Sequence, residues 1–148
     1  MEGLLNRVAE KCLNIFSKTV HIDLDPKQVV FRISGDSLRI TPFIYVGYES
    51  KKFKILGIGD ESVSDIALFK LEVFNFRNIR AKTPLDPEQC LTAFFSQAFR
   101  KLMGSKVFVR PNIVVHNIDR LTAIFPENKE EYIERVLIAA GARKCEFV

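Results

Sequence analysis

Two kinds of side chain in this sequence could carry out chemistry: carboxylates that could bind metal ions, and imidazoles that could activate thiols. Carboxylates gathered at adjoining strand ends can clamp two cations for phosphodiester cleavage, and the candidates are Asp23, Asp25, Asp60, Glu61, Asp65 and Asp119. The same residues are also typical of solvated loops. The apolar stripe of the long helix over residues 90–103 lacks the acid that such a nuclease would need. A metal-dependent nuclease is therefore the alternative, not the leading hypothesis.

The histidines His21 and His116 could act as general bases for Cys90 or Cys145. Both histidines have apolar neighbours in strand-like segments, where a hydrogen-bonded structural imidazole is the more common arrangement. The Gly57-Ile58-Gly59 segment lacks the third glycine and the following helix of a dinucleotide-binding motif. We therefore predict no catalytic residue, no metal ligand and no cofactor.

The composition indicates one globular domain. The 148 residues are 47% hydrophobic and 27% charged, and 22 Lys and Arg against 18 Asp and Glu leave a net charge of +4. No run of like charges predicts a nucleic-acid-binding surface. The three cysteines have neither disulfide-framework nor zinc-site spacing, and no signal peptide or membrane span is indicated. These features predict a cytoplasmic protein that does not bind nucleic acid.

A leading amphipathic helix is predicted within residues 1–19. Apolar residues recur there mostly at three- and four-residue spacing, and those expected to make contacts are Leu4, Leu5, Val8, Leu13 and Phe16. This face could cover the domain's own sheet, a protein partner or a membrane surface. The helix has no Trp and few Lys, so we expect a protein contact and do not favour a membrane anchor.

Residues 20–148 are predicted to form a single α/β domain. Short β-branched and aromatic segments predict a meander of antiparallel strands over 20–24, 28–34, 38–46 and 53–58, with a hairpin turn at 34–37. Helix signals then alternate with strand signals: a helix from Asp86 to Gly104, strands over 107–109 and 113–115, a helix over 127–140 and a strand over 144–148. This order predicts a mixed sheet flanked by helices, the layout of ribonuclease H-like domains, including each half of actin-type ATPases.

With this order, the sequence resembles the first domain of the bacterial rod-shape-determining actin-like family (MreB). His21-Ile22-Asp23-Leu24 resembles the first strand and phosphate loop of that family, which reads Ile-Asp-Leu-Gly-Thr. Ala139-Ala140-Gly141-Ala142-Arg143, followed by a strand, resembles its Gln-Ala-Gly-Ala-Arg segment. Looser matches occur in the same order at residues 42–46, 56–61, 110–115 and 121–122. The resemblance implies an actin-like half-domain over residues 20–148.

The departures from the family pattern imply that its ATPase chemistry is lost. The family's phosphate loop continues with Gly and a hydroxyl residue, which let backbone N–H groups approach a phosphate. Asp25 and Pro26 stand there instead, adding a negative charge and removing a donor. We therefore interpret Asp23, Leu24, Asp25 and Pro26 as a vestigial phosphate loop.

A second departure concerns hydrolysis. The stretch after residues 113–115 reads Ile118-Asp119-Arg120 and then Ala123, so the acid that the family uses to position water is replaced. The family's nucleotide lies between two domains, of which these residues resemble one. From the sequence we expect a non-catalytic actin-like module that binds itself, a related filament protein or another cytoskeletal partner. The alternative is a small metal-dependent nuclease or nucleotide-binding protein of ribonuclease H-like fold.

Overall fold

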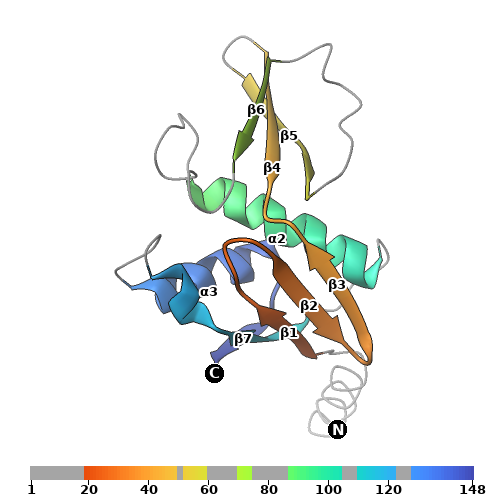
Figure 1. Cartoon of the computed structure of the whole chain (residues 1–148), viewed down its shortest axis with the longest axis vertical. Coiled ribbons are helices and arrows are strands. Elements are labelled where there is room, and N and C mark those ends of the chain that lie inside the picture. Colours follow the sequence, from red (N-terminus) through yellow and green to blue (C-terminus); the bar gives the residue numbers. More distant parts are fainter. Residues whose placement is uncertain (1–18, 50–51, 60–69, 75–86, 105–109, 123–127) are drawn as a thin grey trace, which may run out of the picture.

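The computed structural model describes residues 19–49, 52–59, 70–74, 87–104, 110–122 and 128–148 (Figure 1). Several sequence predictions lie outside these residues: the leading helix with its contact residues Leu4, Leu5, Val8, Leu13 and Phe16, the strand over 107–109, the acids Asp60, Glu61 and Asp65, the helix cap Asp86, and Ala123. In the described part of the chain, no helix is long and apolar enough to cross a membrane.

The larger sheet has five strands in the order β3-β2-β1-β7-β8. They are β1 (Thr19–Asp23), β2 (Val29–Ile33), β3 (Asp36–Ile40), β7 (Asn112–His116) and β8 (Lys144–Phe147). The central strand β1 pairs antiparallel with β2 and parallel with β7, and β7 pairs parallel with β8. The predicted mixed sheet is therefore present, and its parallel part joins the two ends of the described chain.

The predicted single meander is wrong, because the chain leaves the first sheet after β3. The segment predicted as one strand over 38–46 divides at Thr41-Pro42-Phe43 into β3 and β4 (Ile44–Glu49). Pro42 has no N–H group to continue a ladder. Strand β4 then pairs with β5 (Lys52–Ile58) and with β6 (Lys70–Phe74), which the sequence did not predict, in a separate three-stranded sheet.

The hairpin between β2 and β3 turns at the first two residues of the predicted 34–37 segment, and Asp36 and Ser37 already belong to β3. Ser34 and Gly35 have φ angles of 43° and 86°. Two successive positive φ angles are typical of the tight two-residue turns whose twist matches a hairpin. The register of β2 on β3 follows from this turn, because Ile33 pairs with Asp36 next to it.

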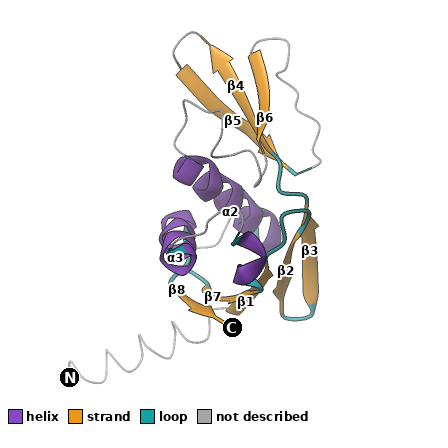
Figure 2. Ribbon diagram, turned by 60° about the vertical axis from the view of Figure 1, so that its left-hand side comes forward, coloured by secondary structure: helices purple, strands orange, loops and turns teal. Residues whose placement is uncertain are grey.

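Two helices pack on the same face of the five-stranded sheet (Figure 2). Helix α2 (Pro87–Met103) begins at the predicted proline, and Gly104 follows it with a φ angle of +82°. Helix α3 (Lys129–Ala140) starts two residues later than predicted, and Gly141 follows its last residue. Helix α2 also contacts β5, so it lies between the two sheets (Figure 1).

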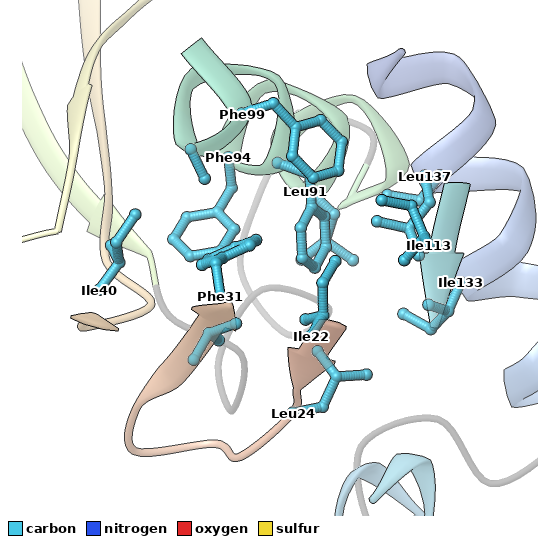
Figure 3. Close-up of a cluster of buried hydrophobic side chains, with 14 of the residues drawn as sticks. Ile22, Leu24, Phe31, Ile40, Leu91, Phe94, Phe99, Ile113, Ile133 and Leu137 are labelled. Atoms are coloured by element: carbon cyan, nitrogen blue, oxygen red, sulfur yellow. The ribbon is translucent and has the colours of Figure 1, made fainter. Parts of the chain in front are cut away.

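The core lies between this helix pair and the inner face of the sheet. Leu91 and Phe94 of α2 face Ile22 of β1 and Phe31 of β2, and all four side chains are fully buried (Figure 3). Phe95 of α2 is fully buried in the same core. The Phe31 and Phe95 rings meet edge to face, with their centroids 6.2 Å apart. Four Phe, at positions 31, 94, 95 and 99, thus supply part of the described core as rings that meet edge to face.

The outer face of the same sheet is polar. Along β1, the buried Val20 and Ile22 alternate with the exposed His21 and the partly exposed Asp23. Strand β7 alternates in the same way, and Arg32 of β2 pairs with His21 on the outer face. The side chains that could do chemistry therefore lie on the side of the sheet opposite the two helices.

Candidate functional site

The candidate site lies where the parallel strands β1 and β7 end. Asp23 is the last residue of β1 and pairs in register with His116, the last residue of β7. Strand β1 has an antiparallel neighbour, β2, on one side and a parallel neighbour, β7, on the other. The chain therefore continues from β1 toward one edge of the sheet and returns at β7 on the other side of β1. Open α/β sheets bind ligands at the carboxyl ends of their strands at such points.

The loop after β1 is closed by its own hydrogen bonds. The N–H of Leu24 donates to the carbonyl oxygen of His116 at 3.1 Å. The N–H of Lys27 donates to Oδ1 of Asp25 at 2.8 Å, which forms an Asx turn. Pro26 has no N–H. Of the four residues from Leu24 to Lys27, only Asp25 has a backbone donor not already used by these contacts.

An arginine from the other strand's loop faces the two carboxylates. After β7 the chain forms a short 3-10 helix, η1 (Ile118–Leu121), which carries Arg120. Nη1 of Arg120 lies 3.3 Å from Oδ2 of Asp25 and 3.7 Å from Oδ1 of Asp23. About half of the Arg120 side chain is exposed, so each pair contributes little to stability, about 0–1 kcal/mol. The effect of Arg120 is local, because its guanidinium offsets the negative charge of both carboxylates.

Asn117 holds this arrangement together. Its backbone adopts the left-handed conformation, with φ 62° and ψ 35°, which Asn tolerates better than most residues. Its side-chain Nδ2 donates to Oδ1 of Asp23 at 2.7 Å, and its carbonyl oxygen accepts from the N–H of Arg120 at 3.0 Å. The left-handed turn at Asn117 therefore directs Arg120 back toward β1.

The two histidines form a pair next to these acids. Nδ1 of His21 lies 3.0 Å from Nε2 of His116, and the rings are stacked with centroids 5.2 Å apart and planes inclined by 29°. The alternative of a thiol and imidazole pair is wrong for both described cysteines. Cys90 is fully buried on α2, and Cys145 pairs with Ile113 and packs toward the core, so the sheet separates both thiols from the imidazoles.

The half-buried Cys145 has a weakly acidic thiol. Burial, and to a lesser degree the negative charge of Glu134, raises the pKa of Cys145 to about 11 from 9.0. The thiolate is the form that attacks disulfides, and a higher pKa leaves less thiolate at neutral pH. Each thiolate is then more nucleophilic, but on a logarithmic scale this offsets only about half of the loss. At pH 7 we expect Cys145 to react with an aromatic disulfide reagent about tenfold more slowly than an exposed thiol.

The rate should rise with pH until about pH 11, where the thiol is half ionised. A Cys12→Ser variant isolates the two described cysteines for this measurement, and the Cys145→Ser variant should abolish the slow phase. A rate that levels off near pH 9 would contradict the raised pKa.

The structure does not bring the predicted nuclease acids together among the residues it describes. Asp23 and Asp25 face Arg120, and Oδ1 of Asp119 lies 3.2 Å from Nζ of Lys129 at the start of α3. In the described ranges, no group of three or more His, Cys, Asp or Glu is placed to hold a metal ion. A two-metal phosphodiester mechanism, which needs several carboxylates on shared cations, gains no support here.

A small cavity lies at the junction of the two sheets. Its volume is about 210 Å³, and its lining includes Ile40, Ile58 and Lys101. Ligand pockets usually measure about 300–1,000 Å³. None of its lining residues belongs to the loops after β1 and β7, so the strand ends remain the better candidate site.

Sequence reasoning singled out the Asp23 to Pro26 loop but missed the role of Arg120 and Asn117. Both residues lie more than 90 positions further along the chain, and the hydrogen bond from Asn117 to Asp23 spans 94 positions. The available signal was an Asn directly after a strand, which is typical of a left-handed turn. That signal predicts a turn, and it does not say what the turn will face.

Comparisons by sequence found no relative: no protein family model matches the chain, and no curated protein matches it. Comparison of the fold with solved structures, in contrast, found actin-like proteins. A non-polymerising variant of MamK bound to AMPPNP matches with a TM-score of 0.58 and 10% identity, over 89% of this chain and 40% of MamK. MreB 5 of Spiroplasma citri bound to AMPPNP matches with a TM-score of 0.53 and 10% identity, over 88% of this chain and 38% of that protein.

The fold is therefore actin-like, and the predicted fold class is confirmed. The chain spans about two-fifths of the length of these two structural neighbours. At 10% identity the likeness concerns the fold alone, and function has to be argued from the site.

Proposed function

We propose that this protein is a non-catalytic actin-like module that acts by binding proteins. Its partner is a second copy of the chain, a related filament protein or another cytoskeletal protein in the cytoplasm. The fold supports the class of protein. The closed loop after β1 supports the loss of nucleotide chemistry, and it is the observation on which the proposal rests.

A phosphate-binding loop works by presenting several free backbone N–H groups to the anion. Here the N–H of Leu24 is bonded to His116, the N–H of Lys27 is bonded to the Asp25 side chain, and Pro26 has none. A phosphate could reach only the N–H of Asp25 directly, and it would have to break both of these hydrogen bonds to gain the donors of Leu24 and Lys27. The loop therefore offers no preformed cradle.

The charges of the loop oppose a nucleotide for a second reason. Asp23 and Asp25 place two carboxylates where a polyphosphate would approach, and one guanidinium, that of Arg120, lies against both. Lys27 is the other cation of this loop, so two carboxylates face two cations and the loop with its arginine has no excess of positive charge to attract an anion. The backbone N–H of Arg120 donates to the carbonyl oxygen of Asn117, whose side chain donates to Asp23. Arg120 is therefore positioned to pair with the carboxylates of its own chain and not with a ligand.

The assembly part of the proposal rests on the fold and on the amphipathic pattern of residues 1–18. Actin-type domains that lack nucleotide chemistry can still present their surfaces to other proteins, because function resides in sites and not in the fold. The apolar residues Leu4, Leu5, Val8, Leu13 and Phe16 are the contact residues that we propose. The alternative of a metal-dependent nuclease or nucleotide-binding protein has no comparable support in the loop.

We expect the protein to self-associate to the same extent with and without ATP, and to bind ATP no more tightly than about millimolar. Light-scattering mass should rise with protein concentration and should be the same with and without ATP and magnesium. Titration calorimetry should detect no ATP affinity tighter than about millimolar, a free energy of about −4 kcal/mol. Micromolar ATP binding by the unaltered protein, or a mass that depends on nucleotide, would contradict the proposal.

Two variants separate the effect of the loop's negative charge from the effect of its missing backbone donors. Asp25→Asn removes the charge but keeps a side-chain oxygen for the N–H of Lys27, so it should remain unable to bind ATP. Asp25→Gly combined with Pro26→Thr frees backbone donors and should bind inorganic phosphate measurably better than Asp25→Asn does. Deleting residues 1–18 should lower the mass at high concentration without affecting the ATP titration.

A further inference from the structure

The proposed function leaves the histidine pair unexplained. His21 and His116 lie on adjacent parallel strands and on the same outer face of the sheet. Nδ1 of one ring lies 3.0 Å from Nε2 of the other. His21 is exposed and His116 is partly buried, so a solute can reach the pair from solvent.

The positions of the two rings are fixed by the sheet. His21 is flanked along β1 by Val20 and Ile22, and His116 follows Val115 on β7; all three apolar side chains are fully buried. A shift of either strand by one residue would turn these side chains outward, so the register of β1 on β7 is strongly held. The two imidazoles are therefore brought together by the core and not by their own attraction.

The close approach of two ring nitrogens has a chemical meaning. Each neutral imidazole has one N–H and one lone pair. At 3.0 Å, one of the two facing nitrogens donates its hydrogen to the lone pair of the other. If that hydrogen moves to the second nitrogen of its own ring, both facing nitrogens present lone pairs to the same point, and no proton is gained or lost.

The spacing suits a tetrahedral metal ion. Zn²⁺ binds imidazole nitrogen at about 2.0–2.1 Å, which places two ligand nitrogens about 3.3–3.4 Å apart in a tetrahedron. The observed 3.0 Å differs from this by a few tenths of an ångström, which a small rotation of the exposed His21 ring would supply. Imidazole is a ligand that Zn²⁺ favours.

We propose that His21 and His116 form a two-imidazole binding site for Zn²⁺ on the outer face of the sheet, with water at the remaining positions. The neighbouring Asp23 is not a free third ligand, since its Oδ1 accepts from Asn117 and faces Arg120. His21 also pairs with Arg32 of the neighbouring strand β2, and the positive charge of Arg32 disfavours the binding of a cation nearby. The site is therefore an accessory one, weaker than a closed structural zinc site.

The test is a calorimetric titration of the full chain with zinc chloride in a buffer that does not bind metal. The unaltered protein should bind one Zn²⁺ per chain. Loss of a residue that merely orients a ligand typically costs about 10–100-fold in metal affinity. His21→Gln and His116→Gln should each weaken binding by at least that tenfold. Both variants should keep the circular dichroism and melting temperature of the parent, because neither residue is in the core.

Three controls exclude other origins of the signal. Arg32→Gln changes a neighbour on the same face and should bind Zn²⁺ at least as well as the parent. Cys12→Ser and Cys145→Ser remove the thiols that could bind zinc and should keep the parent's affinity. No zinc binding by the parent, or equal binding by either histidine variant, would overturn the proposal; so would loss of binding in a cysteine variant.

The site can also be tested by proton competition. Imidazole binds metal only when neutral, so the affinity should fall as the pH is lowered through the range in which histidines take up protons. The charged groups that face the pair are Asp23 and Arg32, with Glu146 of β8 across Val114. The variants Asp23→Asn and Glu146→Gln should therefore retain the fall. A zinc affinity that does not change with pH would contradict imidazole ligation.

Discussion

Replacing Phe95 with Ala should lower the free energy of unfolding by about 3–5 kcal/mol, the usual cost of removing a buried Phe side chain. The ring has no exposed surface and meets Phe94 edge to face at 5.2 Å and Phe31 at 6.2 Å. A domain holds only about 5–15 kcal/mol in total, so most of the stability would be lost. Thermal unfolding followed by circular dichroism should show a fall of roughly 10–20 °C.

The matched control lies on the same helix. Arg100→Ala removes an exposed side chain from α2 and should leave the melting temperature nearly unchanged, within about 0.5 kcal/mol of stability. Phe99→Ala should resemble Phe95→Ala, because Phe99 is 5% exposed and contacts the same Phe31 ring. If Phe95→Ala melted with the parent, α2 could not pack on the sheet as described.

Replacing Val115 with Asp should prevent folding at room temperature. Val115 is fully buried in β7, which is paired on both sides, by β1 and by β8. A carboxyl group there would have no partner, whether charged or neutral, and substitutions of this kind cost more than about 4–5 kcal/mol. We expect insoluble protein, or a chain without a cooperative thermal transition.

The neighbouring residue provides the control. Val114 lies on the outer face of the same strand and is partly exposed, so Val114→Asp should cost about 1 kcal/mol, the range of strand propensity effects. The two substitutions introduce the same group one position apart. Equal effects would mean that the inner and outer faces of β7 have been assigned wrongly.

The helices could be predicted from the sequence because their signals are local. Pro87 at the start of α2, and Gly104 and Gly141 after the two helices, act on the residues beside them. Partition of the strands between two sheets is not local. Only three residues separate β3 from β4, yet the two strands join different sheets, and the partner that β4 takes includes β6, a segment further along the chain.

The same distinction applies to the candidate site. The residues that spoil a phosphate loop, Asp25 and Pro26, are visible in the sequence because the loop is continuous. The guanidinium that faces them comes from η1, and the imidazole that faces His21 comes from β7. Neither contact can be predicted without the pairing of β1 with β7, which brings both segments to the same edge.

That pairing also decides when the protein can fold during its synthesis. His21 and His116 are 95 positions apart, and at roughly 5–20 residues per second a ribosome needs roughly 5–20 seconds to make that length. During this time the hairpin of β2 and β3 can form, but β1 has an open edge that its own chain cannot yet fill. An open strand edge is a template for pairing with other chains. Protection of this one edge, by a chaperone or by another nascent chain, should therefore govern the yield of folded protein in the cell.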